Sequence, residues 1–163
     1  MSTFEDDRYR WRETYFVLFP ASRRPTLKVV EKKLAALSNR YSLENPGGDA
    51  NGKFESLTLI SPDDFAALDV CFTSGVEVLE HAEEMFQELS ATVEPGQRAL
   101  LKRIKGYDGR FDVLHFEQVT DSADEDDELL DPGALLAVLE ELARITDGVA
   151  VDPQSGIILG REE

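Results

Sequence analysis

The chain contains a single thiol, Cys71, and two imidazoles, and a thiol beside an imidazole can act as a nucleophile with its general base. Cys71 lies near the end of a strand-like run in which Leu68, Val70 and Phe72 alternate with polar residues, and His81 lies inside the helical pattern that follows it. Because a helix rises about 1.5 Å per residue from Ser74, the thiol and the imidazole lie on the order of 10 Å apart. The spacing disfavours a Cys–His pair, and we interpret Cys71 as an inert strand thiol and His81 as a surface residue.

The second imidazole, His115, shares a predicted strand face with Phe111 and Val113, and no other histidine is near in sequence to complete a metal site. We therefore predict no metal, no cofactor and no catalytic residue. No nucleophile, base and orienting group can be assembled with workable spacing. A small enzyme is the third hypothesis, and Asp112, His115 and Cys71 are the side chains that would test it.

The stretch NPGGDANGKFES, residues 45–56, has Gly47, Gly52 and Lys53 at the G-x-x-x-x-G-K spacing of a phosphate-binding loop. Such a loop needs Ser or Thr after the lysine and a helix behind it. Here Phe54 follows the lysine and a strand-like run follows Phe54. We interpret the stretch as a hairpin loop in which Asn51 and Gly52 supply positive φ angles.

The run DSADEDDELLD, residues 121–131, carries seven acidic side chains. An EF-hand loop needs Gly at position 6 and Glu at position 12, and neither the register from Asp121 nor that from Asp124 provides them. We expect residues 120–131 to form a mobile acidic loop, with Asp131 as the cap of a helix that starts at Pro132. Weak cation binding and an acidic docking segment stay open as alternatives.

The net charge of −16 excludes some partners. Nucleic-acid affinity comes mostly from cations that displace counterions, so we expect neither nucleic acid nor an anionic membrane as a partner. A lone cysteine suits a reducing compartment, and no run approaches the roughly 20 apolar residues of a membrane span. The expected location is the cytoplasm.

Basic residues gather around two predicted helices, whereas the predicted helix 75–89 carries five glutamates and no lysine or arginine. If the first two long helices lie side by side, their opposite charges face each other. The alternative is a docking surface or an anionic-ligand site on the shorter basic helix. The residues of that candidate site are Arg98, Lys102, Arg103, Lys105 and Arg110.

The order of apolar patterns predicts β-α-β-β-β-α-α-β-α-β-β, and strong helix signals cover 75–89, with Ser74 as cap, and 132–147. The chain is read as one α+β domain, 1–163, with a flexible stretch at 1–12. Its first two thirds resemble the ferredoxin-like βαββαβ pattern. That resemblance implies a mostly antiparallel sheet with helices on one face, extended by a further hairpin strand, a third long helix and a C-terminal hairpin; it implies no activity.

The hypothesis favoured by these observations is a non-catalytic binding or regulatory domain that acts through protein contacts. The partner would be a second copy of the chain or a basic protein, because complementary charge speeds encounter. The alternative is a sensor of a small anionic metabolite, held near residues 98–110.

Overall fold

The computed structural model describes residues 7–119 and 132–159, and in them one antiparallel sheet of seven strands is combined with four α-helices. The strand order is β2-β3-β4-β5-β1-β6-β7. In chain order the strands are β1 (Tyr9–Phe19), β2 (Ser42–Gly48), β3 (Phe54–Ser61), β4 (Ala66–Ser74), β5 (Gly109–Gln118), β6 (Val149–Asp152) and β7 (Ile157–Leu159). The predicted α+β class and antiparallel sheet are confirmed.

The four helices follow the predicted segments. They are α1 (Leu27–Ala35), α2 (Val76–Leu89), α3 (Arg98–Ile104) and α4 (Gly133–Thr146). The strand β1 starts at Tyr9, inside the stretch for which flexibility was expected. The acidic run 121–131, including its predicted cap Asp131, lies outside the described residues.

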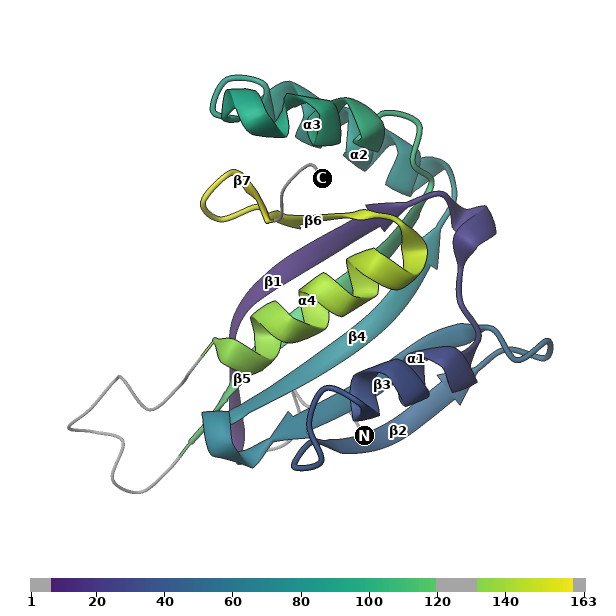
Figure 1. The fold of residues 1–163 in the computed structure, drawn as a ribbon, viewed down its shortest axis with the longest axis vertical. Coiled ribbons are helices and arrows are strands. Elements are labelled where there is room, and N and C mark those ends of the chain that lie inside the picture. The colour runs from purple at the N-terminus through teal and green to yellow at the C-terminus, as the bar shows by residue number, and fades with distance from the viewer. Residues whose placement is uncertain (1–6, 120–131, 160–163) are drawn as a thin grey trace.

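Helices cover both faces of the sheet, so the prediction that they lie on one face is wrong. One core joins α1 and α4 to Val17 and Phe19 of β1. A second core joins α2 and α3 to Leu18, which lies between those two residues in the sequence. Figure 1 shows α1 and α4 in front of the sheet and α2 and α3 together near β6 and β7. The physical reason is the run Val17-Leu18-Phe19, in which successive side chains point to opposite faces and all are buried.

The ferredoxin-like arrangement is not confirmed by the strand order. The long strand β1 lies between β5 and β6, and the hairpin of β2 and β3 extends the sheet beyond β4. The helices α1 and α2 belong to different cores on opposite faces, so the lysines of α1 do not face the glutamates of α2. The predicted intramolecular pairing of those two helices is wrong.

Two helix starts differ from the prediction. Gly75, at φ 119° and ψ −165°, precedes α2 and makes no side-chain cap bond, so Ser74 is not the cap. That backbone conformation is accessible essentially to glycine alone, which explains why a glycine stands between β4 and α2. At α1 the cap is Thr26, whose hydroxyl accepts from the Val29 amide. Proline favours the first helical position, so the sequence alone predicts a helix that begins at Pro25.

The apolar stripe of α2 is rotated from the one that helical spacing in the sequence predicts, which consists of Val76, Leu79, Ala82, Phe86 and Leu89. Val76 and Leu79 are exposed, and the side chains that pack on the sheet are Val78, Ala82, Met85 and Leu89. This rotation places the glutamates of α2 along its solvent-facing sides.

Both edges of the sheet have features that limit further strand pairing. The β2 edge has two register shifts near Pro46, and its turn to β3 is closed by the Asp49 carboxylate, which accepts from the Asn51 and Lys53 amides. In that turn Gly52 has positive φ, but Asn51 does not, contrary to prediction. At the β7 edge, Thr92 donates to the Gly156 carbonyl and Gln97 to the Ile158 carbonyl.

Candidate functional site

The side chains considered for catalysis lie on two different faces of the sheet. Cys71 of β4 and Asp112 of β5 are cross-strand partners on the face that α2 and α3 partly cover. His115 has the parity of Phe111 and Val113, which belong to the core on the other face. The sheet therefore separates His115 from the pair of Cys71 and Asp112.

Cys71 is exposed and is surrounded by negative charge. Partial burial of the thiol, followed by the charges of Asp69 and Asp112, raises its pKa. A raised thiol pKa lowers the thiolate fraction at neutral pH, and the thiolate is the reactive form. This environment disfavours nucleophilic attack by Cys71 at neutral pH.

His81 belongs to a contact that ties α2 to the sheet. The guanidinium of Arg110 lies 2.8 Å from His81 Nδ1, donates to Asp112 Oδ1 at 2.5 Å, and stacks on the Phe16 ring. Partial burial and the charge of Arg110 lower the pKa of His81, opposed by Glu84, Asp112 and Glu88. A neutral His81 can accept from Arg110 through Nδ1. The sequence interpretation of His81 as a surface residue missed this contact, because Arg110 is 29 positions away.

The carboxylates near Cys71 and His81 make one surface, which we call the acidic face. Asp69 and Asp112 come from the strands, and Glu84 and Glu88 from α2. Among the described residues, the apolar core beneath α2 and α3 includes no buried side chain of β2, β3 or β4. The acidic face consists of Asp69, Cys71, His81, Glu84, Glu88 and Asp112.

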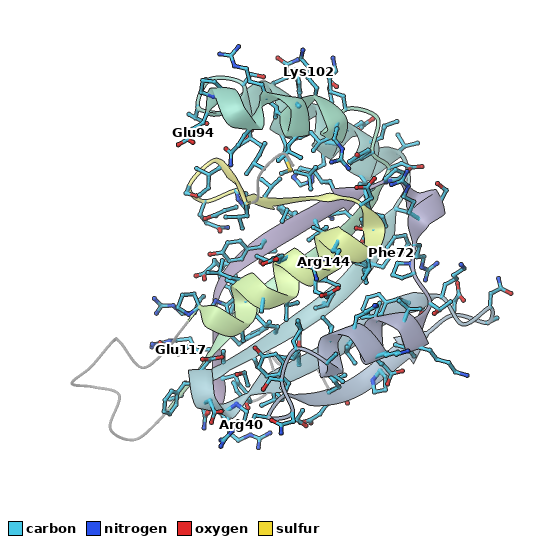
Figure 2. The ribbon with its side chains drawn as sticks, in the orientation of Figure 1. Arg40, Phe72, Glu94, Lys102, Glu117 and Arg144 are labelled. Atoms are coloured by element: carbon cyan, nitrogen blue, oxygen red, sulfur yellow. The ribbon has the colours of Figure 1, made fainter. Side chains whose placement is uncertain are left out.

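The candidate anionic-ligand residues do not point to one common place. Arg110 is engaged by Asp112 and His81, and Lys105 lies over the Phe86 ring. Arg103 donates to Tyr107 and to the Asp147 carbonyl. Arg98 and Lys102 are exposed on α3, and Figure 2 shows Lys102 on the outer side of that helix.

His115 is paired with a carboxylate that the sequence did not suggest. Its Nδ1 lies 2.9 Å from Glu13 Oε1, and the Tyr15 hydroxyl reaches the same oxygen at 3.4 Å. The ring is 1% exposed and its Nε2 has no hydrogen-bond partner among the described residues. Burial, then Glu13 and Asp152, raise the pKa of Tyr15 to about 12. The contact is a cross-strand pair between β1 and β5, separated by 102 positions, so local patterning could not reveal it.

Further chemistry is limited in the part of the chain that the structure describes. It has no group of three or more His, Cys, Asp or Glu side chains placed to hold a metal ion. Gly47 and Gly48 end β2, and the turn that continues to Lys53 is followed by β3 and not by a helix. No helix among residues 7–119 and 132–159 is long and apolar enough to cross a membrane.

Comparison with known proteins gives no family to which the chain can be assigned: no protein-family model, no curated protein and no solved structure matches it.

Proposed function

We propose that the chain is a non-catalytic binding domain that recognises a positively charged protein partner through the acidic face. The observation that carries the proposal is the gathering of four carboxylates, from β4, β5 and α2, around Cys71 and His81. Arg110 is the only cation that acts on His81 in this group, so negative charge prevails there.

A protein partner would meet this surface with lysine or arginine side chains. Complementary charge raises the rate of association and suppresses wrong partners, and rim charges mainly affect the association rate and its salt dependence. The carboxylates of Glu84 and Glu88 lie on α2 near His81, and those of Asp69 and Asp112 lie on β4 and β5 near Cys71. An extended basic segment that crosses from α2 to these strands would meet both sets of carboxylates.

An oligolysine peptide tests the proposal with two variants of equal charge. Glu84→Gln with Glu88→Gln removes two charges from the acidic face. Glu31→Gln with Glu94→Gln removes two charges elsewhere, since Glu31 lies on α1 and Glu94 lies in the connection between α2 and α3. Figure 2 shows Glu94 near the end of that connection.

The proposal predicts that the Glu84/Glu88 variant binds the peptide severalfold more weakly than the wild type at low salt, and that the Glu31/Glu94 variant binds nearly as the wild type does. Affinities from titration calorimetry at two salt concentrations provide the measurement. Equal losses in the two variants would show that only the net charge matters, and the acidic face would then have no special role.

A further inference from the structure

Helix α1 presents lysines to solvent on the sides that do not pack on the sheet. Val30 and Leu34 are the buried side chains of this helix, and Lys28, Lys32 and Lys33 are exposed. The arginines near α1 in the sequence are paired with carboxylates: Arg23 with Asp147, Arg24 with Asp49 and Arg40 with Asp63. The three lysines have no ion pair within the part of the chain that the structure describes. Their charge is therefore free to act on a partner.

An exposed apolar residue lies among these lysines. Val29 is 40% exposed, although α1 has a well-defined buried side. Residues three and four positions apart are neighbours on a helix surface, so Lys32 and Lys33 lie one turn beyond Val29. Protein interfaces combine an apolar centre with a polar rim. The outer side of α1 thus fits a partner helix whose exposed apolar residues are bordered by carboxylates.

The outer side of α2 has this complementary arrangement. Val76 is 68% exposed and Leu79 is 41% exposed, and both Glu80 and Glu83 are exposed beside them. Each glutamate lies four positions after one of the two apolar residues, so here too the charge is one turn beyond the apolar side chain. Neither glutamate forms an ion pair within residues 7–119 and 132–159. The two helices therefore share one spacing and carry opposite charges.

The helices α1 and α2 of one chain cannot satisfy each other. They belong to different cores, on opposite faces of the sheet. Figure 1 shows α1 in front of β3 and α2 beside α3 in another part of the molecule. Complementary surfaces that cannot meet within one molecule can meet between two copies, and such a contact joins two different surfaces and is called heterologous.

We propose that the chain self-associates head to tail, with α1 of one copy packed parallel to α2 of the next. In both helices the charges follow the apolar residue by one turn, so parallel packing places Val29 against Leu79 and the lysines beside Glu80 and Glu83. The net charge of −16 opposes the approach of two copies, but that repulsion is screened over about 8 Å at physiological ionic strength. The paired charges meet directly and are screened less.

This contact is separate from the acidic face. Glu80 and Glu83 do not belong to that surface, so the two proposals can fail independently. A contact between helices of 9 and 14 residues is small. Stable interfaces bury about 1,200–2,000 Å², so a weaker association is expected here. Sedimentation equilibrium of the full chain from about 10 μM to about 1 mM covers that range of affinity.

Two double variants test the two surfaces separately. Lys28→Gln with Lys32→Gln, the lysine variant, keeps the α2 surface intact, and Glu80→Gln with Glu83→Gln, the glutamate variant, keeps the α1 surface intact. The mass of the wild type should rise with concentration beyond that of a dimer, since a heterologous contact can repeat. Each variant alone should associate about tenfold more weakly, because it lacks the charges of one side of the contact.

An equimolar mixture of the two variants should restore the association. The intact α2 of the lysine variant meets the intact α1 of the glutamate variant, and this pair cannot extend further. The mixture is therefore expected to form a one-to-one dimer with the affinity of the wild-type contact and no larger species. Binding in the mixture also shows that both variants are folded.

Glu94→Gln with Glu140→Gln is the matched control, because it gives the same net charge as the glutamate variant through residues of the α2–α3 connection and α4. It should associate as the wild type does. A wild type whose mass does not change with concentration would overturn the proposal. A mixture that associates no better than its components, or a control that is weakened as much as the glutamate variant, would overturn it as well.

Discussion

The two faces of strands β4 and β5 carry different kinds of residue at adjacent positions. Val70 and Phe111 are completely buried under α1 and α4, whereas the neighbouring Cys71 is exposed and Asp112 is half-buried on the acidic face. A single step along either strand thus moves from the core to a charged surface. The comparison suggests that one face of these strands maintains the fold and the other is available for binding.

The largest predicted effect is the loss of stability when a buried residue of β5 is truncated. Phe111 packs against Phe19 at 4.7 Å and Phe54 at 5.5 Å between ring centroids. Phe111→Ala should lower the free energy of unfolding by about 3–5 kcal/mol, because it removes apolar contacts and leaves a cavity. The neighbouring change Asp112→Asn should cost about 1 kcal/mol or less, since it weakens a part-exposed ion pair. Urea unfolding of both variants provides the test, and equal costs would remove the distinction between the two faces.

A second prediction concerns the point where α4 joins the sheet. A Cβ on Gly148 would lie 2.5 Å from the Leu18 carbonyl oxygen and 3.0 Å from Phe19 Cβ. Gly148→Ala should therefore cost about 1–3 kcal/mol of stability through overpacking. Gly96→Ala is the control, because a Cβ there has no atom within 4 Å. Thermal unfolding should separate the two variants; a loss in the control of the same size would point to a different cause.

A smaller, pH-dependent effect on stability is expected at Asp147, which follows α4. Its side chain pairs with Arg103 of α3 and with Arg23 of the turn after β1. Arg23 bonds its carboxylate at 2.6 Å and Arg103 lies at 3.1 Å, and these contacts lower the pKa of Asp147 from its ordinary value of 3.8. A lowered folded pKa stabilises the fold fully above that ordinary value, and the contribution disappears as the pH falls through the folded value.

Asp147→Asn keeps a residue type that tolerates the observed φ of 52° while it removes the charge. Its cost should be about 0–1 kcal/mol at pH 7, since the side chain is largely exposed, and should vanish at pH values well below 3.8. Unfolding measured across this pH range gives the difference between the two proteins. A difference that is independent of pH would mean that charge does not explain the role of Asp147.

The sequence predicted most elements because their signals are local. The apolar run before Pro20, the alternation around Cys71 and the turn glycine Gly52 correspond to β1, β4 and the hairpin between β2 and β3. The apolar run of β1 also indicates that helices cover both faces of the sheet, because an uninterrupted apolar strand is buried on both sides.

Features that depend on register between distant segments could not be obtained this way. The pairing of Glu13 with His115 requires the register of β1 against β5, with its shift between Trp11 and Glu13. The assignment of α3 and α4 to different cores likewise depends on tertiary contacts, and the expected one-sided arrangement did not contain it.

The negative potential of the acidic face can be measured at its only thiol. Thiol–disulfide exchange begins when the Cys71 thiolate attacks the disulfide reagent. At a given pH the thiolate fraction of Cys71 is the same whichever reagent is used. The ratio of the rates with a cationic and an anionic disulfide therefore reports the local charge around the thiol. A carboxylate about 7 Å from the sulfur changes the rate about threefold per unit of reagent charge in water. The proposed binding surface predicts that Cys71 reacts faster with the cationic reagent, relative to a small neutral thiol, and that salt and Asp112→Asn reduce the difference. Equal relative rates, or a preference for the anionic reagent, would contradict the proposal that this face binds a basic partner.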